Sequence, residues 1–428
     1  MLSRMEHDSI GALNVPAEAY YGVQSMRAAT NFQITHRPLH PVLIDSIVMV
    51  KKAAAITNEK SGKLDQQIVQ AIIQACDEIL DGNLRDQFIV DAIQGGAGTS
   101  ANMNANEVIA NRAIEILGGT KGDYSVVHPN DHVNMSQSTN DVIPTAGKIT
   151  VLKLLPQTIK ELEKLEKAME EKEAEFDDIL KMGRTQLQDA VPMRLGQSFG
   201  AFAHVLKRDI KRLKNVMDEM KVLNIGATAI GTAINVDPYY LANISYELSK
   251  VAGISLKQAD DLIDATQNLD GFVSVSGVLK TCAVDISKIS NDLRLMSFGP
   301  RTGLSEINLP ARQNGSSIMP GKINPVIPKV VSQVAYLIIG HDYTITMAAE
   351  AGQCEEYIEK SVGISTALCP YIGYAKSAEI AKKSLKTGIS VKELVLEEGL
   401  LKEEELKEIL KPEKMTQPMR EKVMKAVS

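Results

Sequence analysis

The sequence predicts an all-α protein built around long helices. Alanine, leucine, isoleucine, lysine and glutamate dominate the 428 residues, aromatic residues amount to 4%, and tryptophan is absent. This composition suits helices better than a β-sandwich or barrel. Strand-like alternation is scarce, whereas apolar residues recur at steps of three and four over several stretches. A chain of this length exceeds one simple core, so two or three domains are expected.

The N-terminal part is predicted to begin with an irregular arm, because turn formers stand at Gly11, Asn14 and Pro16 within residues 1–40. Helical patterns follow at 41–60 and 64–80. A third helix at 104–117 is expected to end at the glycine pair 118–119.

The central part is predicted to be a bundle of long helices. In 149–180 the apolar residues follow helical spacing, and most residues between them are lysine or glutamate. Similar stretches cover 193–222, 268–297 and 326–351. A helix of roughly 30 residues is about 45 Å long, which is more than a compact domain needs and suggests a bundle shared between subunits. Shorter helices are expected from 355, with a solvated charged run at 397–410. The expected domains are 1–140, 141–352 and 353–428.

Charge and composition exclude several classes of protein. The formal net charge is -6 and no basic block occurs, so no nucleic-acid partner is expected. The first ten residues lack the apolar core of a signal peptide, and no apolar run is long enough to cross a membrane. The cysteines are dispersed and form no CxxC pair, which is typical of reduced thiols in a cytoplasmic protein. They are Cys76, Cys282, Cys354 and Cys369.

Two polar segments in the first half of the chain interrupt the helical pattern. The first is GGAGTSANMN at 95–104, where glycines before a helix N-terminus would suit a carboxylate, although a plain turn with an N-cap explains it equally well. The second, HPNDH at 128–132, runs into SQSTND at 136–141. Pro129 argues against a helix that would place His128 and His132 on one face, and without a third ligand nearby we expect no metal site.

A third polar segment, GSSIMPGKINP at 315–325, is the most specific signal in the chain. Glycines at both ends indicate a mobile loop, Lys322 is its only cation, and Asn324 offers an amide just before a helix start at Pro325. A bland interhelical loop would not need two serines, a lysine and an asparagine so close together.

This third segment matches the signature loop of the aspartase/fumarase superfamily almost letter for letter. The first two segments resemble the other active-site regions of that superfamily, and the similarity extends to the arm sequence EAYYGV at 18–23. Within the superfamily, residues 95–99, 135–139 and 325–328 look like aspartases, and fumarases tend to differ there.

The resemblance implies a three-domain, all-helical fold that assembles as a homotetramer with shared active sites. It implies elimination of ammonia from L-aspartate to give fumarate, without cofactor or metal. The first serine of the loop, Ser316, is the implied base that removes the C3 proton and gives an aci-carboxylate, with Lys322 as a helper. The implied substrate-binding residues are Thr99, Ser138, Thr139, Asn140, Thr185, Gln186, Ser317 and Asn324.

Three departures from the family pattern keep alternatives open. Gln186 stands where the pattern carries a histidine, and Lys329 stands where it carries the glutamate that pairs with that histidine. A further long helix is also missing after 350–353. The alternatives are a fumarase-type hydratase, or an impaired or non-catalytic homologue that binds a dicarboxylate.

Overall fold

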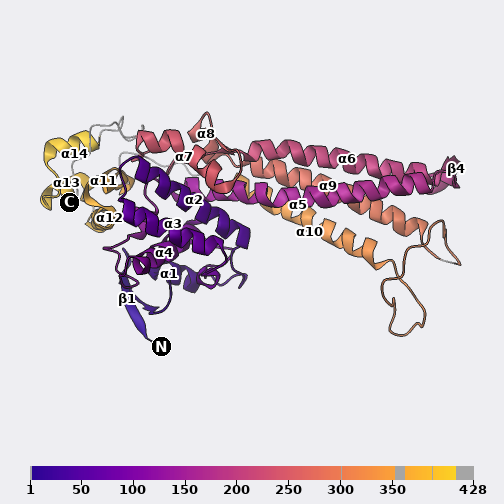
Figure 1. Cartoon of the computed structure of the whole chain (residues 1–428), viewed down its shortest axis with the longest axis horizontal. Helices are drawn as coiled ribbons and strands as arrows, with labels where there is room; N and C mark the ends of the chain where they lie inside the picture. Colours follow the sequence, from indigo (N-terminus) through magenta and orange to yellow (C-terminus); the bar gives the residue numbers. More distant parts are fainter. Residues whose placement is uncertain (1, 300, 352–361, 388, 411–428) are drawn as a thin grey trace. The chain divides into compact units, whose positions relative to one another are not determined.

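The computed structural model describes residues 2–299, 301–351, 362–387 and 389–410 (Figure 1). Helices dominate, so the predicted all-α fold class is confirmed. The chain forms two compact units: the first contains 1–150, 221–268 and 353–428, and the second contains 151–220 and 269–352. The three-domain division at 140 and 352 stays a prediction. Among the described residues, no helix combines the length and apolarity needed to span a bilayer.

The first unit holds most of the short elements. Its regular elements, in chain order, are β1 (Ser3–His7), β2 (Ala12–Pro16), α1 (Val23–Asn31), α2 (Pro41–Lys60), α3 (Gln66–Leu80), the 3-10 turn η1 (Arg85–Gln87), α4 (Thr99–Ile116), the π-helical turn η2 (Pro129–Val133), the start of α5 (Thr139–Glu175), β5 (Val222–Leu223), α7 (Pro238–Ala252), β6 (Lys257–Gln258), α8 (Leu262–Gln267), η3 (Val362–Leu368), α11 (Cys369–Ile372), α12 (Tyr374–Thr387), α13 (Val391–Glu397) and α14 (Glu403–Ile409).

The predicted N-terminal helices are present and capped. Asp65 precedes α3 and accepts a 2.8 Å hydrogen bond from the backbone of Gln67, which satisfies a free N–H of the first turn. Val69, Ile72 and Ile79 then lie on one buried face of α3, as their spacing requires. Helices α2 and α3 match the predicted stretches closely, whereas α4 begins at 99 rather than at the predicted 104.

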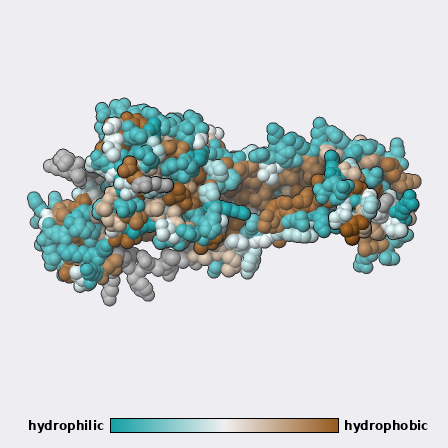
Figure 2. Space-filling view, turned by 90° about the horizontal axis from the view of Figure 1, so that it is seen from below, coloured by the Kyte–Doolittle hydropathy of each residue, from teal (hydrophilic) through white to brown (hydrophobic). Residues whose placement is uncertain are grey.

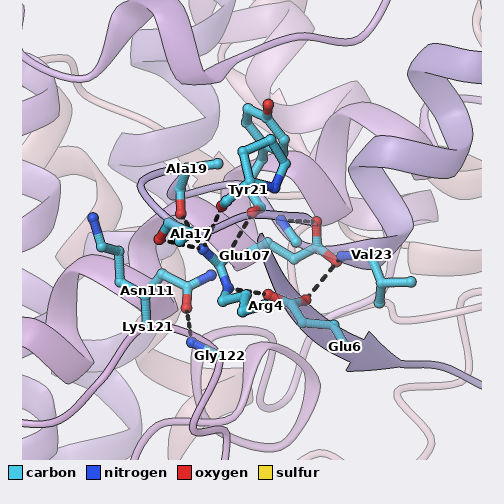
Figure 3. A network of polar contacts seen from close by, with 12 residues as sticks. Arg4, Glu6, Ala17, Ala19, Tyr21, Val23, Glu107, Asn111, Lys121 and Gly122 are labelled. Atoms are coloured by element: carbon cyan, nitrogen blue, oxygen red, sulfur yellow. Dashed lines mark hydrogen bonds and ion pairs between the residues drawn. The ribbon is translucent and has the colours of Figure 1, made fainter. Parts of the chain in front are cut away.

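The prediction of an irregular N-terminal arm was wrong. Residues 3–16 form an antiparallel hairpin, in which Ser3 pairs with Pro16, and α1 follows it. Figure 3 shows Arg4 donating to the backbone carbonyls of Ala17, Ala19 and Tyr21, just after the hairpin. These bonds join residues 13 to 17 positions apart, so no local sequence pattern announces them.

Two buried carboxylates hold the start of α1 in the same network. The Glu107 carboxylate, on α4, accepts the backbone N–H groups of Gly22, Gln24 and Ser25 at 2.9–3.0 Å. Glu6 accepts the N–H of Val23 at 2.9 Å (Figure 3). Together they satisfy donors that the N-terminus of a helix leaves free.

The C-terminal part contains short helices, as expected. They are α11 to α14, and the predicted charged run 397–410 contains α14. Leu406 of α14 is buried, whereas the acidic residues of its first turn are exposed, so the run is a solvated helix face. Cys354 and the expected start of these helices at 355 lie outside the described residues.

The second unit is a bundle of long helices. It comprises the rest of α5, the hairpin strands β3 (Leu180–Thr185) and β4 (Gln188–Arg194), α6 (Leu195–Met220), α9 (Asp270–Met296) and α10 (Val326–Glu350). Helix α9 packs against both α6 and α10 (Figure 1). The four predicted long helices are therefore present, although the first spans 139–175 rather than 149–180. Residues 352–361, where the family pattern would continue into a further helix, lie outside the described residues.

Helix α10 has an unusual distribution of side chains. Its buried residues are small or polar, namely Ser332, Ala335 and Asp342, and Asp342 accepts a 2.6 Å hydrogen bond from Lys280 on α9. Many of its large apolar residues are exposed instead, and Figure 2 shows a band of hydrophobic side chains over the long helices. Four of them follow steps of three, four and three residues and are 47–58% exposed: Ile327, Val330, Val334 and Leu337.

Candidate active site

The N-termini of α4 and α5 lie side by side in the first unit. Thr99 is the first residue of α4 and Thr139 is the first residue of α5. A Cβ on Gly98, the N-cap of α4, would lie 2.9 Å from Ile143 of α5, so the two helix ends touch. The Asn102 side chain donates to the Thr139 hydroxyl at 3.3 Å. Two helix N-termini carrying hydroxyls form a donor-rich surface that suits a carboxylate.

A reciprocal cap starts α5. The Asp141 carboxylate accepts the backbone N–H of Ser138 at 2.9 Å, and the Ser138 hydroxyl accepts the N–H of Asn140 at 3.3 Å. The sequence Ser-x-x-Asp at 138–141 is the corresponding capping signal. The cap therefore fixes the turn that carries three of the predicted substrate-binding residues, and Asn140 is exposed at its tip.

A buried network supports this turn. The Lys51 ammonium, on α2, donates to the side-chain oxygens of Asn134 and Gln137 at 2.8 and 2.9 Å. The Asn134 oxygen also receives bonds from Asn102 and Asn106 of α4 at 3.2 Å. The network thereby joins α2, α4 and the segment before α5.

Burial shifts the pKa values of two charged side chains behind the turn. It raises the pKa of Asp141 to about 7, and it lowers the pKa of Lys51 to about 7, while each charge favours the ionised form of the other. Both side chains are completely buried. The ionisation of each of these two side chains therefore depends on the charge of the other.

The histidines of the second polar segment form a compact turn, contrary to the argument from Pro129. Residues 129–133 make one π-helical turn with Pro129 at its first position, where its missing N–H costs nothing. His128 accepts the N–H groups of Asn130 and Asp131 through Nδ1 at 3.1 Å. His132 accepts the N–H of His128 through Nδ1 at 3.0 Å. Burial lowers the pKa of both histidines.

The third polar segment is a closed loop in the second unit. The backbone N–H of Gly315 donates to the carbonyl of Lys322 at 2.7 Å, and the Asn324 amide donates to the carbonyl of Gly315 at 2.9 Å. The Lys322 side chain is exposed, and within the described part of the chain its ammonium is in no ion pair. The loop thus keeps a cation available beside its two serines.

Ser316 occupies a position that would stabilise its own anion. Its hydroxyl oxygen accepts the backbone N–H groups of Ile318 and Met319 at 3.2 and 3.0 Å. Two donors that converge on one oxygen favour the alkoxide over the neutral hydroxyl. This is the requirement for a serine that acts as a base.

Thr185 and Gln186 lie at the tip of the β3–β4 hairpin, which the sequence did not reveal. The two turn residues, Gln186 and Leu187, have φ of 51° and 64°, a conformation usually supplied by Asn-Gly. Behind the tip, Glu306 accepts a 2.7 Å hydrogen bond from Arg184 and lies 3.3 Å from the Lys181 ammonium. These contacts fix β3 to the segment that leads into the Ser316 loop.

Comparisons with known proteins identify the family. A family model described as "Lyase" matches residues 11–340, and one described as "Fumarase C C-terminus" matches residues 364–417. An aspartate ammonia-lyase from Bacillus sp. is 49% identical, over 97% of this chain and 98% of the relative. The chain belongs to the aspartase/fumarase superfamily.

Solved structures of this superfamily share the fold. A fumarate lyase:delta crystallin from Brucella melitensis, bound to cobalt, has a TM-score of 0.81 and 46% identity, covering 97% of this chain and 100% of that one. A class II fumarase from Schistosoma mansoni has a TM-score of 0.79 and 32% identity, covering 97% and 99%. The alignment to the Bacillus relative extends over 457 positions, more than the 428 residues present here, so this superfamily member carries gaps relative to it.

The predicted site residues fall into two sets. The first unit brings Thr99, Ser138, Thr139 and Asn140 onto two adjoining helix ends. The second unit carries Thr185 and Gln186 on the hairpin, and Ser316, Ser317, Lys322 and Asn324 on the loop.

Sequence reasoning overlooked the side chains that support these sets. Lys51, Asn134 and Glu306 act through contacts distant in sequence. Only Asp141 had a local signal, the capping pattern with Ser138. In this aspartase/fumarase superfamily member, Lys51 and Glu306 lie outside the three recognisable segments and contact residues that carry or flank them.

Proposed function

We propose that this protein eliminates ammonia from L-aspartate to give fumarate. One observation carries the proposal: the chain is 49% identical to the Bacillus aspartate ammonia-lyase over nearly the whole of both chains, against 32% for the Schistosoma fumarase. The retained donors at Thr99, Ser138 and Thr139 and the cation at Lys322 fit a substrate with two carboxylates.

The first chemical step is removal of a proton from C3 of aspartate. The Ser316 oxygen, as an alkoxide, takes this proton. The two backbone N–H groups that donate to this oxygen stabilise the alkoxide. The electron pair of the C3–H bond moves into the adjacent carboxylate, which becomes a dianionic aci-carboxylate. Hydroxyls and helix N-termini of the kind found at Thr99 and Thr139 stabilise such a dianion.

The second step breaks the C2–N bond. The aci-carboxylate collapses, a double bond forms between C2 and C3, and the ammonium group leaves as ammonia with the electron pair of the broken bond. Asn140 contacts the departing amine, and Gln186 supplies a neutral hydrogen-bonding group. No cofactor takes part in this scheme.

The remaining site residues hold the two carboxylates during both steps. Ser138 and Ser317 donate to the reacting carboxylate, where the negative charge increases. Lys322, Asn324 and Thr185 hold the other carboxylate, and Lys322 provides the charge-assisted contact.

We also propose that the active site is assembled in a homotetramer. The exposed apolar residues of α10 follow the three-and-four spacing of a helix-packing seam. A surface of this kind is normally covered by another subunit. Several chains would then contribute donors to each site, and the dispersed thiols fit assembly in the cytoplasm.

A direct assay tests the proposed function. Purified protein is mixed with L-aspartate, and fumarate is followed by its ultraviolet absorbance, with L-malate as the parallel substrate. Fumarate from aspartate supports the proposal. Fumarate from malate alone would indicate the fumarase-type alternative, and no product from either would indicate a non-catalytic homologue.

A further inference from the structure

The loop after β5 is bound tightly to the N-terminus of α5. Residues 224–233, here called the Ala229 loop, are mostly buried in the first unit. Thr228 and Ala233 adopt φ of 58° and 54°, which is uncommon for residues other than glycine and costs energy. Such a conformation persists only where surrounding contacts impose it.

Asp141 supplies contacts that hold this loop. One carboxylate oxygen accepts the backbone N–H groups of Gly226 and Thr228, each at 3.1 Å. The other oxygen accepts the N–H of Ser138 at 2.9 Å. A single buried carboxylate therefore joins the Ala229 loop to the turn that carries the predicted substrate contacts.

The loop in turn fixes the side chain of Asn140. The Asn140 Nδ2 group donates a 2.6 Å hydrogen bond to the carbonyl of Ala229. Asn224 donates to the backbone carbonyl of Asn140 at 3.0 Å. With its nitrogen engaged by the loop, the exposed amide of Asn140 presents its oxygen, Oδ1, to a ligand.

An acceptor at this position has a specific chemical value. The neighbouring groups on the two helix ends, at Thr99 and Thr139, are hydroxyls and backbone N–H groups suited to a carboxylate. The ammonium group of an amino acid carries three N–H donors and needs an acceptor. If the Asn140 amide were free to rotate, its NH2 group could donate to a carboxylate as readily as its oxygen could accept from an amine.

We propose that Asp141 and Asn224 are positioning residues that hold the Ala229 loop so that Asn140 presents Oδ1 to the amino group. The inference rests on the proposed ammonia-lyase function. On this proposal the Ala229 loop makes the site prefer an amine at this point. Asp141 and Asn224 act through the loop and do not touch the substrate.

The test uses the full-length protein in the amination direction, with fumarate consumption followed by absorbance. Asp141→Asn and Asn224→Ala should each raise the KM for ammonium about tenfold, the loss expected when a hydrogen bond to a charged group is weakened. The KM for fumarate should stay within about twofold of wild type. Asn224→Ala leaves the Asp141 cap in place, and in Asp141→Asn the remaining amide oxygen can still accept the N–H of Ser138, whereas the new NH2 group can no longer accept from Gly226 and Thr228.

Glu107→Gln is the matched control. Glu107 is also a buried carboxylate that accepts three backbone N–H groups, and its contacts are with the start of α1 rather than with the turn. This variant should leave the KM for ammonium unchanged. A rise equal to that of Asp141→Asn would mean that any loss of a buried carboxylate has the same effect, which would overturn the inference.

The outcomes separate the inference from the function on which it rests. Equal rises in both KM values, or an unchanged KM for ammonium, would overturn the inference while leaving the lyase function intact. Should Asp141→Asn fail to fold, Asn224→Ala decides by the same criterion. A wild-type protein that aminates no fumarate and deaminates no aspartate would overturn both.

Discussion

The side-chain amide of Asn324 donates to the backbone carbonyl of Gly315, 2.9 Å away and nine residues earlier in the chain. This bond closes the loop that carries Ser316 and Lys322. A Cβ on Gly315 would lie 2.8 Å from Asn324 Cγ and 2.9 Å from the Lys322 carbonyl. Only glycine, which has no Cβ, therefore fits at position 315 without a steric clash.

Gly315→Ala should open the loop and misplace its serines. We expect kcat/KM for aspartate to fall by about 100-fold, the effect of a displacement near 1 Å at a reacting group, while the helices remain intact by circular dichroism. Gly277→Ala, on α9, is the control, because a Cβ there meets no atom within 4 Å. Activity close to wild type in Gly315→Ala would show that the loop tolerates the extra methyl group.

Ser316→Ala tests the base. Turnover should fall by about a thousandfold or more, in the range that a general base contributes, with the fold and oligomeric state unchanged. Ser317→Ala is the neighbouring comparison and should lower turnover by a smaller factor, because it removes one donor to the reacting carboxylate and leaves the base in place. Activity of Ser316→Ala within about tenfold of wild type would point to another base.

Lys322→Met should raise the KM for aspartate by roughly 10- to 100-fold, because a carboxylate would lose its charge-assisted partner. Steady-state kinetics with the variant measure this directly. Lys329, exposed in the first turn of α10, is the other cation close in sequence. If the KM barely changes in Lys322→Met but rises in Lys329→Met, Lys329 has taken over the role.

Glu306→Gln should destabilise the protein near neutral pH but not in acid. The hydrogen bond from Arg184 is the main cause that lowers the pKa of Glu306 below the ordinary 4.5, and the charge of Lys181 adds to it. A carboxyl with a lowered folded-state pKa stabilises the fold above its unfolded pKa and loses this contribution as the pH falls through the folded value. Urea unfolding of wild type and variant should therefore differ at pH 7 and converge as the pH falls below 4.5 and through the lowered pKa of Glu306. A difference that is constant with pH would assign the effect to packing instead.

Val334→Glu tests the homotetramer. A charge in the middle of the exposed apolar row on α10 should break the assembly, because burying it without a partner is costly. Light scattering should show the mass of a smaller species, and activity should fall with it. Gln157→Glu, at an exposed position of α5 outside this row, is the control for one added negative charge. A fully active wild-type monomer would contradict the prediction of shared sites.

The sequence supported the prediction of long helices and of the three polar segments, for a physical reason. Helical spacing and glycine–serine clusters are local signals, and a loop such as 315–325 is closed by its own residues. The N-terminal hairpin was missed because Arg4 and Glu6, besides pairing with each other, bond residues outside the hairpin. The role of Asp141 in holding the Ala229 loop was equally hidden, since that contact spans 85 to 87 positions.

The hairpin tip at Gln186 and Leu187 has a consequence for protein engineering. Each left-handed residue other than glycine costs roughly 1–2 kcal/mol, and Asn-Gly would relieve that cost at the two positions with φ of 51° and 64°. A library screened only for heat resistance would therefore favour exchanges at this turn. Because Gln186 belongs to the proposed site, such clones would gain melting temperature and lose turnover, so any thermostability campaign on this protein should keep the pair fixed.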